Sequence, residues 1–239
     1  MATIDLLFIS DTSYQQRMGS QNAELADLAN IVTVGNDAYA QSNALVQLRM
    51  AGYQRLSVDW TNVTLQDLLS DLKLMGGSFA TTWAQTVLSG ADVPVAVSAF
   101  TAAKGSFCGL GTVGTFNSAG LLSTGLAGGA AIAMARGSRP GFFCEDITLS
   151  HEVGHVMGSL HDRANATGSG AFSYSYGYGV ANGPNPFGDI MSYLKPRQPY
   201  FSSPGLFTCL GQACGTATDD AVRTFNQTAP AVEIGRAHV

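Results

Sequence analysis

The feature that most constrains this chain is the window 151–162, HEVGHVMGSLHD, which holds three of the four histidines. His151 and His155 lie four residues apart, and on an α-helix that spacing puts both imidazoles on one face, one turn apart. Two imidazole nitrogens placed in this way can bind a single zinc ion at about 2.0–2.1 Å. The window therefore predicts a helix that carries a metal site, and the rest of the fold must be built around that helix.

Three further residues of the window complete the predicted site. Glu152 directly follows the first histidine, so its carboxylate is expected close to the metal without binding it, where it can take a proton from a metal-bound water. Gly158 can adopt the left-handed conformation that ends a helix, which lets the chain return His161 as a third ligand. Three protein ligands leave a fourth position open for water, as in catalytic zinc sites. A purely structural site would need a fourth protein ligand, and the one remaining histidine is His238.

The window resembles the HExxHxxGxxH motif of the metzincin metallopeptidases. Residues 189–193, DIMSY, are similar to the Met-turn of that clan, and Asp162 after the third histidine is similar to the adamalysin and reprolysin branch. The resemblance implies a secreted zinc-dependent endopeptidase, closest to secreted bacterial reprolysin-like enzymes. It also implies an α/β (α+β) metzincin-like zincin fold, in which a five-stranded mixed twisted sheet with helices lies above a cleft. An active-site helix and a small irregular C-terminal lobe with the Met-turn complete that fold.

The resemblance assigns roles to individual residues. It implies that the three histidines bind zinc, while Glu152 acts as general base toward the zinc-bound water and then protonates the leaving amine. It implies that Met191 packs beneath the histidines without binding the metal, although an ordinary core thioether is the alternative.

Two residues near the predicted site have open interpretations. Tyr193 resembles the astacin and serralysin tyrosine that reaches the zinc or steadies the oxyanion, but a wall residue of the specificity pocket is an equal alternative. Asp162 is predicted to be a hydrogen-bond acceptor that fixes the lobe beneath the zinc, with a solvated turn aspartate as the alternative. Tyr193 and Asp162 are marks of different branches of the clan. The specificity pocket is expected between Met191 and Pro204.

Residues 109–114 match the pattern GxGxxG. A dinucleotide site would need a helix directly afterwards and an acidic residue about twenty positions on, whereas a loop rich in glycine and serine follows here. The segment fits better as an edge strand at the rim of the cleft, to which an extended peptide substrate can add by main-chain hydrogen bonds. The residues of this substrate edge strand are Gly109, Leu110, Gly111 and Thr112.

The four cysteines allow three disulfide pairings. Cys209 and Cys214 flank a short glycine-containing loop and are predicted to pair with each other, which leaves Cys108 with Cys144. Disulfides are favoured because the zinc-peptidase interpretation implies an oxidising compartment. The alternative is four buried free thiols in a cytosolic protein.

Hydrophobic patterning predicts strands that alternate with helices, and hence a mainly parallel sheet with helical cover. Strands are expected over 4–10, 44–58, 93–99, 108–113 and 130–135, and helices over 23–42, 65–74, 79–88, 147–157 and 219–226. Asp146 is expected to cap the zinc helix. We expect one catalytic domain, 1–239, with an upper lobe over about 1–158, a lower lobe over about 159–234 and a possible added tail at 235–239.

Composition narrows the remaining function classes. A net charge of −5 with no basic cluster argues against a nucleic-acid partner, and no apolar run approaches the ~18 residues of a membrane span. We expect a monomer that acts on protein or peptide substrates, whose signal peptide and any propeptide are absent from this sequence. Ca²⁺ binding is possible but not indicated, because no Asp-rich ligand loop is visible.

One alternative function belongs to a different class. The chain could be a catalytically silent zinc-containing binding or toxin-like protein on the same fold. The intact Glu152 argues against this alternative, because a protein without catalysis has no need of the base.

Overall fold

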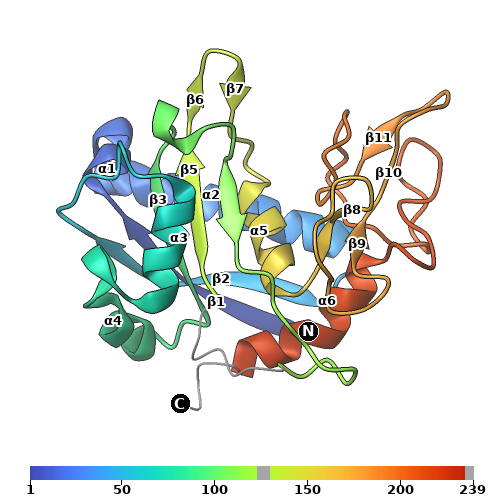
Figure 1. The fold of residues 1–239 in the computed structure, drawn as a ribbon, viewed down its shortest axis with the longest axis horizontal. Coiled ribbons are helices and arrows are strands. Elements are labelled where there is room, and N and C mark those ends of the chain that lie inside the picture. Colours follow the sequence, from blue (N-terminus) through green and yellow to red (C-terminus); the bar gives the residue numbers. More distant parts are fainter. Residues whose placement is uncertain (123–129, 235–239) are drawn as a thin grey trace.

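The computed structural model describes residues 1–122 and 130–234, and the predicted tail at 235–239 lies outside them. Its main sheet has five strands in the order β2-β1-β3-β5-β4 (Figure 1). The first four strands pair in parallel and β4 pairs antiparallel to β5, which confirms the predicted mixed sheet. The strands are β1 (Ala2–Ser10), β2 (Val46–Arg55), β3 (Val93–Ala99), β5 (Ile132–Arg136) and β4 (Gly109–Gly111).

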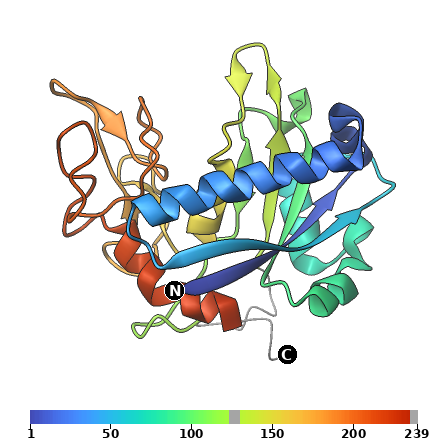
Figure 2. The same ribbon diagram turned by 180° about the vertical axis from the view of Figure 1, so that it is seen from behind.

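Helices cover both faces of this sheet. In the order of the chain they are α1 (Thr12–Met18), α2 (Gln21–Gln41), α3 (Leu65–Leu74), α4 (Thr82–Ser89), α5 (Thr148–Val156) and α6 (Ala221–Ile234), with short 3₁₀ turns η1 (Gly77–Phe79) and η2 (Ala102–Lys104). Figure 2 shows α2 lying along one face, and α3 and α4 cover the opposite face (Figure 1). This arrangement follows from the βαβ connections between parallel strands.

The alternation of side chains along β1 divides the core into two clusters. Ile4, Leu6 and Phe8 pack with α2, α5 and α6 on one face. Leu7 and Ile9 pack with α3 on the other. A strand that is apolar on both faces must lie in the interior of a sheet, and β1 does so between β2 and β3.

After α5 the chain forms loops with short strand pairs. The pairs are β8 (Leu160–Asp162) with β9 (Tyr176–Gly177), and β10 (Gly179–Val180) with β11 (Phe187–Gly188). Above the sheet, β6 (Ser138–Arg139) and β7 (Phe142–Phe143) form a hairpin that projects from the end of β5 (Figure 1).

Both predicted disulfides are present. Cys108 pairs with Cys144 across a Cα–Cα distance of 5.3 Å, and Cys209 pairs with Cys214 at 5.2 Å. The first links the start of β4 to the segment just before α5, and the second closes a loop of the C-terminal part. In the two described ranges, no helix is long and apolar enough to cross a bilayer.

Several boundaries differ from the sequence predictions. The hairpin β6–β7 and helix α1 have no predicted counterpart, and β4 is shorter than the expected 108–113. The closing helix is longer than the expected 219–226, because it continues through Pro230 to Ile234. Its buried residues Phe225, Ala229 and Val232 hold it against the sheet, so burial outweighs the hydrogen bond lost at the proline.

Candidate metal centre

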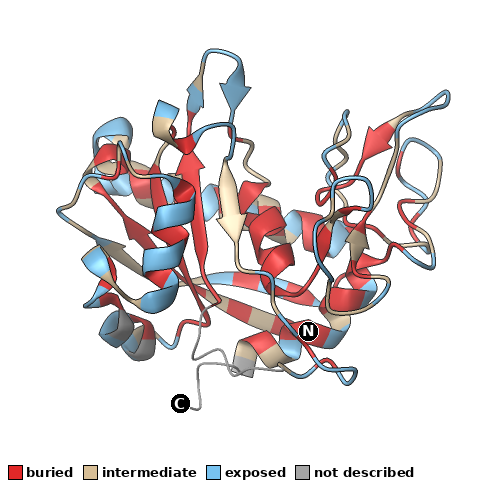
Figure 3. Cartoon of the chain, in the orientation of Figure 1, coloured by how far each residue is buried: buried red, intermediate tan, exposed pale blue. Residues whose placement is uncertain are grey.

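The window 151–162 begins on α5, whose nine residues are all buried (Figure 3). The predicted cap by Asp146 is wrong. Asp146 Oδ1 accepts from Arg136 at 2.8 Å and its Oδ2 from Asn30 at 2.9 Å, so the carboxylate is already engaged. The helix begins at Thr148 without a side-chain cap, and Thr148 Oγ1 instead donates to the Glu145 carbonyl at 2.7 Å.

Gly158 ends this helical segment as the sequence predicts. Its φ is +87°, and its amide donates to the carbonyl of His155 at 2.8 Å. A Cβ at this position would lie 2.6 Å from the Cβ of Ala171, so both the backbone conformation and the space require glycine. The turn leads into β8, which carries His161 back toward the helix.

The three histidines converge through their Nε2 atoms. His161 Nε2 lies 3.2 Å from that of His151 and 3.1 Å from that of His155. The Nδ1 atoms of His151 and His155 face the carbonyls of Ile190 and Ser159 at 2.7 and 2.8 Å, an arrangement that places the proton on Nδ1 and leaves the Nε2 lone pair free. Such converging lone pairs repel one another unless a cation lies between them.

This donor set fits zinc. Tetrahedral ligands at about 2.0–2.1 Å from the ion lie about 3.3 Å from one another, which is close to the two observed nitrogen separations. The candidate ligand atoms all lie within 4.8 Å of one another. The backbone carbonyls behind the rings are the partners that usually orient metal-binding histidines.

Burial keeps all three imidazoles neutral, as metal ligands must be. It lowers the pKa of His155 to about 4 and holds that of His151 well below its ordinary value, with neighbouring histidines adding to both shifts. Burial also lowers the pKa of His161, although the nearby Asp162 opposes this. At neutral pH the lone pairs are therefore not blocked by protons.

Glu152 lies between the histidines and the rim strand β4. Burial raises its pKa to about 8, and a hydrogen bond from the Gly111 backbone only partly opposes this. A Cβ at Gly109 would lie 2.5 Å from Glu152 Oε1, and one at Gly111 would lie 2.6 Å from the Glu152 carbonyl oxygen. Glycine at both positions lets the rim strand approach this carboxylate closely. A cation at the histidines would favour its ionised form.

Asp162 and Met191 support the site from below. Asp162 Oδ2 accepts from Ser192 Oγ at 3.0 Å and from the Tyr193 amide at 2.9 Å, so it joins the His161 segment to the Met-turn. Met191 is fully buried, and its Sδ would lie 2.6 Å from a Cβ on Gly154 of α5. The Met-turn therefore packs directly against the helix that carries two of the histidines.

Tyr193 lies at the mouth of the site. Its ring is 4.2 Å from that of His161 between centroids, and the residue is 48% exposed. Burial of the hydroxyl and the nearby Glu152 raise the pKa of Tyr193, so at neutral pH it is a hydrogen-bond donor.

Two cavities, of about 420 and 170 Å³, meet at this centre. Both are lined by Phe107, Gly109, His151, Glu152 and Tyr193. A substrate bound across the histidines would therefore have space on either side.

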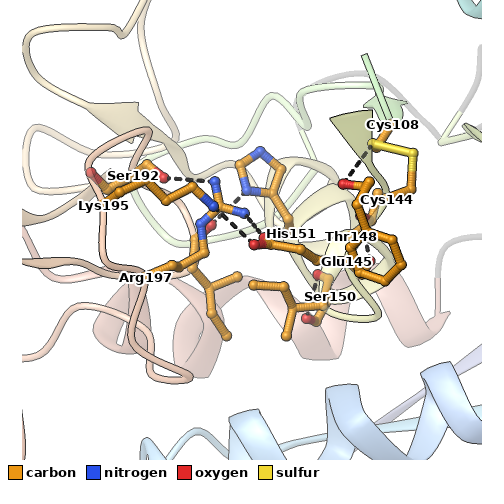
Figure 4. A network of polar contacts seen from close by, with 12 residues as sticks. Cys108, Cys144, Glu145, Thr148, Ser150, His151, Ser192, Lys195 and Arg197 are labelled. Atoms are coloured by element: carbon orange, nitrogen blue, oxygen red, sulfur yellow. Dashed lines mark hydrogen bonds and ion pairs between the residues drawn. A yellow bond between two sulfur atoms is a disulfide. The ribbon is translucent and has the colours of Figure 1, made fainter. Parts of the chain in front are cut away.

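One group of site residues was missed by sequence reasoning. Glu145, Lys195 and Arg197 line the larger cavity and form a network beside His151 (Figure 4). Lys195 and Arg197 fall within the expected pocket segment, but no sequence pattern links them to Glu145, fifty residues earlier.

Solved structures and a family profile show what this chain is similar to. No curated protein sequence matches the chain. A solved structure titled as a chaperone–substrate complex matches with a TM-score of 0.72 and 22% identity, over 98% of this chain and 35% of that one. This chain thus spans about a third of that protein, and the match shows the fold alone. Metalloproteinase-II from Bacteroides fragilis matches with a TM-score of 0.49 and 14% identity, over 87% of this chain and 52% of that one.

The sequence profile of the reprolysin-like metallo-peptidases, family M12B, matches residues 1–220. That range includes every element of the main sheet and all the converging histidines. The chain therefore belongs to the reprolysin-like metallo-peptidase family M12B.

Proposed function

We propose that this protein is a secreted zinc endopeptidase in which His151, His155 and His161 hold the metal and Glu152 is the general base. The observation that carries the proposal is the convergence of three neutral imidazoles, with Nε2 separations of 3.1 and 3.2 Å, beside a buried carboxylate. The two disulfides support an oxidising, extracellular location.

When bound, zinc supplies a Lewis acid that polarises the scissile carbonyl and acidifies water. Glu152 accepts the proton of the attacking water and returns it to the nitrogen of the leaving amine. The protonated hydroxyl of Tyr193 donates a hydrogen bond to the carbonyl oxygen as negative charge develops there. Asp162 and Met191 touch no substrate in this scheme, and they position the segment that bears His161 and the helix α5.

The rim strand β4 provides a place for the substrate backbone. It lies at the end of the sheet order and pairs with β5 on one side only. An extended peptide can add to its other edge through main-chain hydrogen bonds, which brings the scissile bond over the histidines. Gly109, Leu110, Gly111 and Thr112 are the proposed contacts.

The test is cleavage of denatured casein by zinc-loaded protein, with and without the chelator phenanthroline. We expect internal cleavage that the chelator stops and that added zinc restores. Glu152→Gln should keep one zinc per chain and lose about 10²–10⁴ in rate. A zinc-loaded, folded wild type that cleaves neither casein nor a diverse peptide library would instead indicate a silent zinc-binding protein.

A further inference from the structure

The larger cavity continues from the metal centre along one side of α5. Away from the metal centre, where Glu152 also lines the cavity, one wall carries three charged residues: Glu145, just before the helix, and Lys195 and Arg197, which follow the Met-turn (Figure 4). Lys195 Nζ lies 2.9 Å from Glu145 Oε1, and Arg197 Nη1 lies 2.5 Å from Glu145 Oε2. Both carboxylate oxygens of Glu145 are therefore already paired with cations.

This wall carries a net positive charge. Burial alone would raise the pKa of Glu145, but the hydrogen bond from Lys195 and the charge of Arg197 outweigh it and hold the pKa below its ordinary value. Glu145 is therefore ionised at neutral pH, and one negative charge faces two positive charges. His151, which also lines the cavity, is neutral, and Glu152 lies at the other end beside the histidines.

The two cations differ in their surroundings. Lys195 has 58% of its side chain exposed, whereas Arg197 has only 19% exposed. Arg197 Nη2 donates to the Ser192 carbonyl at 3.2 Å, and its Nε has no hydrogen-bond partner among the residues that the structure describes. Arg197 is thus already partly desolvated, and it shares the carboxylate of Glu145 with Lys195. Its guanidinium can pair with a second carboxylate at little further cost of desolvation.

Part of the remaining lining is apolar. This part is formed by Phe107, Phe142, Phe143 and by Cys108 of the disulfide to Cys144, whereas Ser106 and Thr148 add hydroxyl groups. Such walls suit the methylene stem of a side chain whose tip is charged. The cavity of about 420 Å³ is large enough for one such side chain.

We propose that this cavity binds the acidic side chain, aspartate or glutamate, of a substrate residue next to the scissile bond, with Lys195 and Arg197 as the specificity-determining residues. The inference rests on the proposed function and adds its substrate class. A basic side chain would find Glu145 already engaged and would meet two like charges. A wholly apolar side chain would bury the ion pairs without giving them a partner.

The test uses a set of peptides that are identical except at the two residues flanking the bond, with Glu, Gln, Asp, Asn, Leu or Lys at each in turn. Cleavage positions are mapped by mass spectrometry. At one of the two flanking positions, wild type should cleave the peptide with the acid faster than the peptide with the isosteric amide. The expected difference in kcat/KM is at least about tenfold, because the acid gains a charge-assisted pair with the cavity wall.

Variants connect the preference to the cavity. Lys195→Met should reduce the acid-over-amide ratio, and Lys195→Glu should abolish or reverse it. The exposed Lys73 of α3 provides the matched control, since Lys73→Glu makes the same change in net charge outside the cavity and should leave the ratio unchanged.

Binding to the zinc-loaded variant Glu152→Gln gives a readout without turnover. The acidic peptide should bind it at least about tenfold more tightly than the amide peptide, and adding Lys195→Glu should remove the difference. Equal binding and equal cleavage of the two peptides would overturn the inference, while the cleavage itself would still support the peptidase. A binding preference without cleavage of any peptide by wild type would overturn the proposed function and leave the assignment of this cavity to acidic side chains standing.

Discussion

The contact between the rim strand and the general base gives a quantitative prediction. In Gly109→Ala the new Cβ would lie 2.5 Å from Glu152 Oε1, whereas ordinary contacts begin at 3.4 Å. The shortfall is 3.4 − 2.5 = 0.9 Å. Because β4 is held by its pairing with β5 and by the neighbouring disulfide at Cys108, the carboxylate must move rather than the strand.

A displacement of about 1 Å in a catalytic group costs about 10²-fold in rate. We therefore expect Gly109→Ala to lose about 10²-fold in kcat/KM on a fluorogenic peptide, with one zinc per chain by mass spectrometry and an unchanged circular dichroism spectrum. Gly76→Ala is the control, since a Cβ there meets no heavy atom within 4 Å. If folded, zinc-loaded Gly109→Ala stayed within about threefold of wild type, the position of Glu152 would not depend on β4.

Four further predictions concern the metal, the oxyanion, the cross-link and a buried acid. His155→Ala should lose stoichiometric zinc by mass spectrometry, and full occupancy would contradict its role as a ligand. Tyr193→Phe should lower kcat by at least about tenfold at unchanged zinc content, while an unchanged kcat would make the residue a wall of the pocket. Replacing Cys108 and Cys144 by serine should lower the free energy of unfolding by about 4 kcal/mol on the chain-entropy model, measured by denaturant titration. Burial raises the pKa of Asp189 to about 8, above its unfolded value of about 4. The free energy of unfolding should therefore fall as pH rises from about 4 through 8. Asp189→Asn should flatten that decline.

The metal window could be predicted from the sequence because its geometry is local. The spacing of His151 and His155 fixes their common helix face, and Gly158 fixes the turn that returns His161. Each of these inferences spans a few residues and depends on backbone conformations that nearby residues determine. The Met-turn was found in a different way, through its resemblance to a known family.

The charged wall of the larger cavity could not be predicted in this way. Glu145 precedes α5, and Lys195 and Arg197 follow the Met-turn, so their contact depends on how two distant segments pack. The same kind of tertiary competition explains the wrong cap. Asp146 has the right residue type and place in the sequence for a cap, but Arg136 from β5 takes its carboxylate.

The disulfide between Cys108 and Cys144 connects the two parts of the site. Cys108 directly precedes Gly109, whose missing side chain makes room for Glu152, and Cys144 directly precedes Glu145 on the cavity wall. One covalent link therefore fixes both the distance from the rim strand to the base and the distance from the rim strand to the charged wall. Rate and acid preference should for that reason decline together when this link is removed. Removal of the other disulfide, Cys209–Cys214, should affect neither, because it closes a loop that lines neither cavity.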